Sequence, residues 1–211
     1  MICVLLSGGI DSTYLLHQMI QKNNKIKCII FDYQQPVATQ EKIAAQKICD
    51  HYGIDLLCLP IVEIGTEMNT GIGTKGARVV ENRNQTFLCY AHSIYPDADL
   101  AMGANANDYD DYADCRPEFF RAMSKTLGVK IYTLCHMSKK EIIKKSRQAK
   151  IPIKKTWSCY QADLNNQQCG TCNSCIERKI NTNYLYDFLS TKKSRLINKI
   201  YTSKYYKIIS K

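Results

Sequence analysis

Two groups of residues in this sequence could do chemistry, and one lies near its start. Glycine and hydroxyl residues make up most of Ser7–Thr13, which lies between an apolar run, Ile2–Leu6, and a helix-like run, Tyr14–Ile20. This order predicts a strand, a glycine turn and the N-terminus of a helix. The backbone N–H groups of a first helical turn have no partner inside the helix and lie at the positive end of its dipole, so they bind anions. The segment is therefore a candidate phosphate-binding loop.

The residue types of this loop suit a nucleotide. Gly8 and Gly9 let the backbone approach a phosphate where a Cβ atom would obstruct it, and Ser7, Ser12 and Thr13 can add hydroxyl donors. A Walker A loop has a lysine before its Ser/Thr, and this loop has none, which argues against a kinase-type grip on a γ-phosphate. The alternative is an ordinary Ser/Gly turn before a helix; we favour ATP binding.

The second group is a cluster of cysteines with the spacing C-x9-C-x2-C-x2-C: Cys159, Cys169, Cys172 and Cys175. Two-residue spacers let neighbouring thiolates converge on one ion, and four sulfur ligands suit a closed, structural zinc site. An iron–sulfur cluster is the main alternative, because it also takes four thiolates. No fifth thiolate lies nearby in the sequence and no redox motif is evident. We therefore expect one structural Zn²⁺ per chain, which would hold residues 155–180 against the sheet.

Strand-like and helix-like stretches alternate along the first two thirds of the chain. The strands are expected at Ile2–Leu6, Lys27–Phe31, Asp55–Leu59, Ala98–Met102 and Lys130–Leu134. The helices are expected at Ser12–Lys22, Gln40–Tyr52, Arg83–Tyr95 and Arg116–Leu127, and from a capping box at Ser138 to about Ala149. Such alternation implies parallel strands joined by right-handed crossovers.

We therefore predict an α/β fold with a doubly wound, mostly parallel, Rossmann-like sheet in residues 1–150. A small zinc-binding segment with a helical C-terminal tail should follow in residues 151–211. Ligands of an open parallel sheet collect at the carboxyl ends of its strands, and the glycine loop, the residues after the second strand and Gly103–Asn107 all fall there. The glycine-rich stretch Gly65–Gly76 is expected to be a mobile loop over this edge.

The composition limits the class of protein. The chain has 211 residues, 45% of them hydrophobic, and no apolar run approaches the roughly 20 residues of a membrane span. We expect no signal peptide before the first strand and, because the cysteines outside the cluster suit buried thiols, a cytoplasmic protein. The net charge is +10, and seven basic residues but no acidic one follow Asp187. This asymmetry permits a contact with nucleic acid, although we favour a solvated helix face.

The glycine loop resembles the PP-loop of the adenosine-nucleotide α-hydrolase family, which holds the pyrophosphate end of ATP while a substrate is adenylated. Further stretches resemble the 7-cyano-7-deazaguanine synthase family within it: Gly103–Phe119, Arg83-Asn84 with Phe87-Leu88, Thr156–Tyr160, Cys169–Cys175 and Arg178. Together with Phe31–Tyr33, these motifs extend the resemblance from about residue 1 to about residue 180. The combination is specific, although each motif alone is not.

The resemblance implies a fold of the PP-loop ATP pyrophosphatase type and a homodimer that acts on small molecules. The family makes the nitrile precursor of queuosine-type bases from 7-carboxy-7-deazaguanine, ammonia and ATP, with zinc bound by the four cysteines. Adenylation turns a carboxylate oxygen into a leaving group, ammonia then gives the amide, and a second activation allows loss of water to the nitrile. Positioning and charge stabilisation would carry most of this catalysis, and Mg²⁺ is expected with the ATP.

The resemblance also implies roles for particular residues. The nucleotide-binding set would be Leu6, Ser7, Gly8, Gly9, Ile10, Asp11, Ser12, Thr13, Asp32 and Tyr33. Asp11 would contact magnesium or water, or else only complement the helix dipole. Arg83 would pair with the substrate carboxylate or a phosphate, or else remain solvated. The loop after the fourth strand carries Asp108, Asp114 and Arg116, and an Asp there could accept from the guanine-like N1–H and amine. Alternatively, Asp114 caps a helix that begins near Arg116.

Aromatic residues near these motifs could contact the ring of the substrate. Tyr109 or Tyr112 could stack on it, whereas Tyr33, Trp157 and Tyr160 are either walls of the pocket or core aromatics.

Two stretches depart from the family pattern. Gln34–Val37 stands where the family usually has Gly-Gln, a basic residue and His, and Val80–Asn82 stands for Val-Pro-Gly. These changes leave open an enzyme that stops at the amide or acts on another 7-deazaguanine. A PP-loop tRNA-modifying adenylase or thiolase is a further alternative, with Cys115 as its extra thiol. The last alternative is a non-enzymatic zinc-knuckle module that binds nucleic acid.

Overall fold

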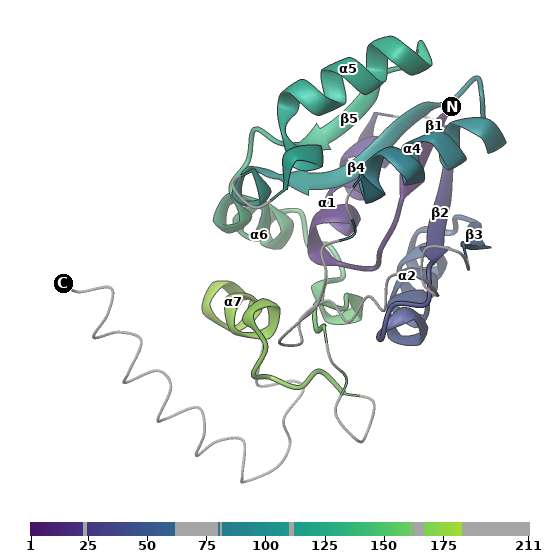
Figure 1. Ribbon diagram of the computed structural model, residues 1–211. Coiled ribbons are helices and arrows are strands. Elements are labelled where there is room, and N and C mark those ends of the chain that lie inside the picture. The colour runs from purple at the N-terminus through teal and green to yellow at the C-terminus, as the bar shows by residue number, and fades with distance from the viewer. Residues whose placement is uncertain are drawn as a thin grey trace, which may run out of the picture.

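A parallel five-stranded sheet forms the centre of the structure (Figure 1). The structure is a computed structural model, and it describes residues 1–22, 25–61, 80, 82–109, 112–160, 162 and 167–182. The strands are β1 (Ile2–Leu5), β2 (Ile26–Asp32), β3 (Leu56–Pro60), β4 (Asp99–Asn105) and β5 (Ile131–Leu134). Neighbouring strands are parallel in the order β3-β2-β1-β4-β5, so the chain winds outward from β1 in both directions. The predicted doubly wound α/β fold is confirmed.

Helices connect these strands and follow the last of them. In the described part of the chain they are α1 (Ile10–Gln21), α2 (Ala38–Tyr52), α4 (Arg83–Ile94), α5 (Pro117–Leu127), α6 (Lys139–Gln148) and α7 (Asn173–Thr182). Short 3-10 turns lie at η1 (Ala106–Asp108), η2 (Ala113–Cys115) and η3 (Ile153–Lys155). None of the described helices is both long enough and apolar enough to cross a bilayer.

Each face of the sheet has its own hydrophobic core. Successive side chains of a strand point to opposite faces, and in β1 Ile2 and Val4 join a cluster with residues of α1, α2 and α6. Cys3 and Leu5 join a second cluster with residues of α4 and α5. Because both faces of β1 are covered, the strand is apolar throughout and its polar chemistry is confined to the loop at its end.

The predicted elements agree with the observed ones, with ends that differ by up to three residues. For example, β4 continues to Asn105 rather than ending at Met102, because its pairing with β5 resumes at Asn105 after an irregularity. The predicted capping box is confirmed. Ser138 Oγ accepts from the Glu141 N–H at 3.3 Å, and Glu141 Oε2 accepts from the Ser138 N–H at 2.8 Å.

Two expected segments cannot be compared with the structure, and the expected burial of the scattered cysteines holds only in part. Gly65–Gly76 and the tail at 183–211 lie outside the described residues. The scattered cysteines that are buried, as expected, are Cys3, Cys28, Cys49, Cys115 and Cys135. Cys89 is half-buried and Cys58 is exposed, so the expectation is wrong for Cys58, which lies on the edge strand β3.

Two glycines let the phosphate loop approach its neighbours closely. Gly8 has a φ of +77°, and a Cβ on it would lie 2.9 Å from the Ala44 Cβ and 2.9 Å from the Glu41 carbonyl oxygen, both in α2. A Cβ on Gly103 of β4 would lie 2.8 Å from the backbone nitrogen of Ser12 in α1. Real side chains do not tolerate such contacts, so glycine at both positions allows the first turn of α1 to lie between β4 and α2.

We expect Gly103→Ala to lower the free energy of unfolding by roughly 1–3 kcal/mol, because the new methyl group would push the first turn of α1 off the sheet. Gly53→Ala is the matched control: Gly53 has a φ of +65° and no atom within 4 Å of its added Cβ, so only backbone strain of about 1 kcal/mol should appear. Urea unfolding of both variants measures the difference. Equal losses would contradict the close approach described here.

Candidate active site

A cavity of about 570 Å³ opens at the carboxyl edge of the sheet. Its walls are the end of β1 with the phosphate loop, the end of β2, the end of β4 with η1, η2, the stretch after η3, and the first turns of α2, α4, α6 and α7. A cavity of this size suits a small ligand or nucleotide. The edge at which the sequence predicts ligand binding is therefore hollow.

Hydroxyl groups hold the phosphate loop in shape. Thr13 Oγ1 and Ser12 Oγ both donate to the Gly9 carbonyl oxygen, at 2.7 and 3.2 Å, and Ser7 Oγ lies 3.2 Å from Ser12 Oγ. The loop residues that line the cavity are Leu6, Ser7, Gly9, Ile10, Asp11 and Ser12. Gly8 and Thr13, also predicted to bind the nucleotide, lie behind them. They shape the loop rather than face the cavity.

A buried ion pair lies beside this loop. Asp11 Oδ2 accepts from Lys139 Nζ at 2.5 Å and from Asn105 Nδ2 at 3.2 Å. Lys139 was not predicted to be a site residue. The sequence feature that could have identified it is its position as the first residue of α6. A cation there lies at the positive end of the helix dipole, which is unfavourable unless an anion is nearby.

The predicted Asp108 also lines the cavity, close to this pair. Its Oδ2 accepts from the Asn105 backbone N–H at 3.1 Å, which fixes the carboxyl group at the end of β4. Burial raises the pKa of Asp108, and the charge of Asp11 adds to the effect. A proton is therefore held more readily here than on an exposed carboxyl group.

Arg83 occupies another wall of the cavity, at the start of α4. Its Nη1 donates to the Tyr33 hydroxyl at 3.1 Å, and its guanidinium carbon lies 5.8 Å from the centre of the Tyr33 ring. Burial alone would lower the pKa of Arg83, but its attraction to the Tyr33, Asp114 and Glu41 side chains raises it. Within the described residues, no carboxylate lies within ion-pair distance of Arg83. Arg83 is thus a charged donor available to a ligand.

Glu41 in the first turn of α2 is a second residue that sequence analysis missed. Its Oε2 accepts from Gln35 Nε2 at 2.7 Å, and Gln35 Oε1 accepts from the Tyr33 backbone N–H at 3.0 Å. Burial raises the pKa of Glu41. Both Gln35 and Glu41 line the cavity, so the stretch that departs from the family pattern contributes directly to its wall.

Asp32, by contrast, does not line the cavity. Lys42 Nζ lies 2.7 Å from Asp32 Oδ2, and Asp32 Oδ1 accepts from the Gln34 backbone N–H at 3.1 Å. The hydrogen bond from Lys42 lowers the pKa of Asp32. The structure therefore separates Asp32 from Tyr33, its predicted partner in nucleotide binding, which does line the cavity.

Asp114 caps α4. Its Oδ2 accepts from the Asn84 backbone N–H at 3.0 Å, and Asn84 Nδ2 donates to the Asp114 carbonyl oxygen at 3.0 Å. The alternative prediction, that Asp114 caps the helix near Arg116, is wrong, because α5 has no side-chain cap and begins with Pro117. Arg116 itself is exposed and outside the cavity wall, and its Nε donates to the Tyr109 carbonyl oxygen at 3.0 Å.

Cys115 is buried next to this cap. Asn84 Nδ2 donates to its Sγ at 3.3 Å, and burial raises the pKa of the thiol to about 12. A thiol with such a pKa carries almost no thiolate at neutral pH, and the thiolate is the nucleophile. This environment disfavours the thiolase alternative.

The aromatic candidates divide into two groups. Tyr112, Trp157 and Tyr160 line the cavity, as does Tyr33, which also packs against Phe87 with ring centres 5.4 Å apart. Tyr109 is outside the cavity wall and packs against the second core cluster instead.

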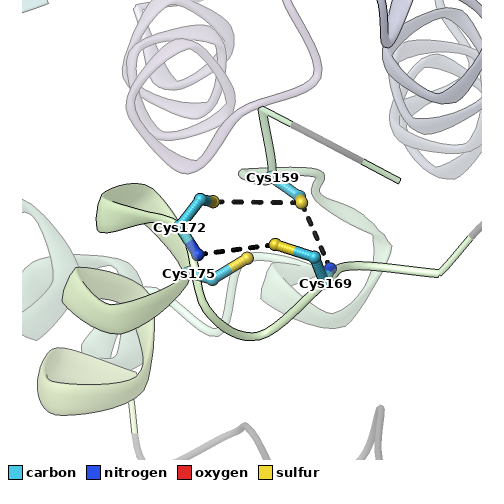
Figure 2. Close-up of side chains that lie close together, drawn as sticks. All are labelled: Cys159, Cys169, Cys172 and Cys175. Atoms are coloured by element: carbon cyan, nitrogen blue, oxygen red, sulfur yellow. Dashed lines mark hydrogen bonds between the residues drawn. The ribbon is translucent and has the colours of Figure 1, made fainter. Parts of the chain in front are cut away.

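The four clustered cysteines turn their sulfur atoms toward a common centre (Figure 2). All four Sγ atoms lie within 4.8 Å of one another, and those of Cys159 and Cys172 are 3.9 Å apart. Sulfur atoms of a tetrahedral zinc site are about 3.8 Å apart, given Zn–S bonds of about 2.3 Å. The Cys169 backbone N–H donates to Cys159 Sγ at 3.2 Å, and the Cys172 N–H to Cys169 Sγ at 3.4 Å. The cluster could therefore hold a metal ion.

Arg178 of α7 links this cluster to the cavity. Its Nη1 donates to Thr156 Oγ1 and Ser158 Oγ, each at 2.8 Å, and its Nη2 to the Ile153 carbonyl oxygen at 2.8 Å. Between these residues, the Trp157 backbone N–H donates to the carbonyl oxygen of Gly8 in the phosphate loop at 2.8 Å. The segment that carries the four cysteines thus packs on the phosphate-loop end of the cavity.

Comparison with known proteins shows the family of the chain. A family model described as Queuosine biosynthesis protein QueC matches residues 1–184. Proteins named 7-cyano-7-deazaguanine synthase from Thermoplasma acidophilum and Leptospira interrogans are each 34% identical to the chain, over 83% of it and 84% of their own length. The structure of NMN synthetase from Francisella tularensis is similar in fold, with a TM-score of 0.55 and 14% identity over 90% of this chain and 89% of that one. The resemblance seen in the motifs is confirmed, and the chain belongs to the QueC family of queuosine biosynthesis proteins.

Proposed function

We propose that the protein converts 7-carboxy-7-deazaguanine and ammonia into 7-cyano-7-deazaguanine at the cost of ATP. The observation that carries this proposal is the cavity itself, which joins the phosphate loop at the N-terminus of α1 to the half-buried side chain of Arg83. A substrate with a carboxylate and a nucleotide with phosphates match these two walls. The names of the similar proteins from Thermoplasma and Leptospira support the same product.

In the proposed reaction, a carboxylate oxygen of the substrate attacks the α-phosphorus of ATP and pyrophosphate leaves. Ammonia replaces AMP to give the amide. The amide oxygen is then activated by a second ATP and lost with AMP, which leaves the nitrile. The N–H groups of the loop would hold the pyrophosphate, and Arg83 would hold the carboxylate. Asp108 and Tyr112 would contact the deazaguanine ring.

Two metal ions fit this scheme. Zinc would be structural, because all four ligands of a tetrahedral site come from the cysteines. Magnesium would be held by Asp11, whose Oδ1 is buried and has no hydrogen-bond partner among the described residues, and it would neutralise charge on the triphosphate. The homodimer and the cytoplasmic location expected from the sequence stay predictions, as does the alternative of a nucleic-acid contact.

Product mass tests the proposed function. The protein with ATP, Mg²⁺, ammonium and 7-carboxy-7-deazaguanine should yield a product about 19 mass units lighter than the acid, from loss of two waters and gain of ammonia. A product about one unit lighter would mean that the reaction stops at the amide. An unchanged acid, with pyrophosphate released only when RNA is added, would contradict the assignment and support an RNA-modifying adenylase.

Arg83→Gln tests the carboxylate contact. Loss of a charged donor should lower kcat/KM for the acid by about a hundredfold. The neutral amide, supplied as the second substrate, should lose less than about tenfold, because it brings no carboxylate to Arg83. Arg121→Gln is the control, since Arg121 is exposed and pairs only with Glu118 on the surface. Equal losses for acid and amide would place Arg83 on a phosphate instead.

Cys172→Ala should abolish stoichiometric zinc and lower the melting temperature, because binding free energy of a structural zinc is also folding free energy. Cys58→Ala removes an exposed cysteine outside the cluster and should change neither property. Metal analysis and thermal unfolding give both readouts. Full zinc content in Cys172→Ala would contradict the ligand set, and acid-labile sulfide in the wild type would indicate an iron–sulfur cluster.

A further inference from the structure

The ion pair between Asp11 and Lys139 lies where the proposed nucleotide would put its phosphates. Both residues line the cavity, and their side chains are only 17% and 20% exposed. Asp11 is in the first turn of α1, directly after the phosphate loop, and Lys139 begins α6. A negative carboxylate beside an anion-binding loop would repel a triphosphate unless a cation neutralised it.

Lys139 is placed by contacts that do not depend on the ion pair. Its backbone N–H donates to Asn107 Oδ1 at 2.9 Å, and the Ser138–Glu141 capping box fixes the start of α6. The α6 backbone therefore holds the base of the side chain, while the ammonium group can change partners. Lysine is suited to such an exchange, because its charge sits on a flexible stem.

The ammonium group of Lys139 is bound to one oxygen of the Asp11 carboxylate, with Nζ 2.5 Å from Oδ2. Asp11, for its part, uses only Oδ2 for Lys139 and Asn105. Its buried Oδ1 has no partner in the described part of the chain.

The phosphate loop has no lysine of its own, and the described residues that line the cavity include just two cations, Arg83 and Lys139. Arg83 hydrogen-bonds to Tyr33 at the start of α4, whereas Lys139 adjoins the loop. Lys139 is thus the cation next to the expected position of the pyrophosphate.

We propose that Lys139 is a phosphate-binding residue that exchanges partners, neutralising Asp11 in the nucleotide-free protein and moving to the β,γ-phosphates when ATP binds. This rests on the ATP site of the proposed function. As the substrate oxygen bonds to the α-phosphorus, the bond to the bridging oxygen breaks and its electron pair passes to the leaving pyrophosphate. Lys139 neutralises that charge, and Asp11, once released, is free to hold a divalent cation.

Calorimetric titration of the full chain with ATP, pyrophosphate and AMP tests this. Lys139→Met should weaken ATP and pyrophosphate by about 10- to 100-fold, the value of one charged hydrogen bond, and AMP by less than about threefold, because AMP has no β,γ-phosphates. Lys139→Arg should recover most of the loss. Lys140→Met is the matched control, since it removes the same charge from the next, exposed residue of α6. Equal weakening of all three ligands would mean a structural role and overturn the proposal.

Asp11→Asn provides a second test that does not depend on turnover. Without its carboxylate, the variant should bind metal-free ATP at least as tightly as the wild type and should lose the gain in affinity that Mg²⁺ gives the wild type. If Lys139→Met does not fold, the double variant Asp11→Asn/Lys139→Met, which leaves neither charge unpaired, replaces it in the titrations. A retained Mg²⁺ effect in Asp11→Asn would overturn the exchange.

The outcomes separate this proposal from the proposed function. If Lys139→Met binds pyrophosphate as tightly as the wild type, the inference is wrong even when the wild type makes the nitrile. If the wild type makes neither nitrile nor amide but Lys139→Met still loses affinity for ATP and pyrophosphate, the phosphate role stands and the synthase assignment fails. A wild type that binds neither ligand contradicts both.

Discussion

The buried guanidinium of Arg178 fixes the relation between the two chemical centres. It is 4% exposed, and its planar fork spans three acceptors, one in η3 and two in the stretch that follows it. That stretch reaches the phosphate loop through the hydrogen bond from Trp157 to Gly8, and it carries Cys159, the first of the four clustered cysteines. Removing Arg178 would leave buried acceptors without donors and would release α7 from the loop. The segment that carries the cysteines and the phosphate-loop end of the cavity therefore depend on each other: a change in the order of one would change the shape of the other.

The cavity combines fixed charges of both signs and offers no activated nucleophile among the described residues that line it. Asp11, Asp108 and Lys139 lie at the loop, while Glu41 and Arg83 belong to other parts of the wall. Charges removed from water persist only where partners or hydrogen bonds compensate them. Such an arrangement suits a reaction that moves negative charge from a carboxylate to a leaving pyrophosphate, because the stabilising groups are in place before the charge develops.

Local pattern predicted the fold well, and it predicted those parts of the site that follow from spacing. Apolar runs and glycine turns located all five strands, and the cysteine spacing located the metal cluster. The Lys139–Asp11 contact joins residues 128 positions apart, which no local pattern encodes. Asp32 and Arg116 have the expected residue types, but Lys42 binds the side chain of Asp32, and Arg116 donates to the Tyr109 carbonyl oxygen. Neither lines the cavity, whereas Asp114 does, although its Oδ2 also caps α4. Competition among polar neighbours, which depends on three-dimensional structure, decided which of the three face the cavity.

The hydrogen bonds between Asp114 and Asn84 have a consequence for how such a site can change. They join the loop after β4 to the residue that follows Arg83, so the two stretches move as one rigid unit. A substitution that reshapes the loop for a larger or smaller ring would also shift the guanidinium of Arg83, which is proposed to bind the carboxylate. Relatives that have adapted to a different base should therefore show paired replacements at these two stretches, whereas the cysteine segment, tied to the opposite wall, can stay constant.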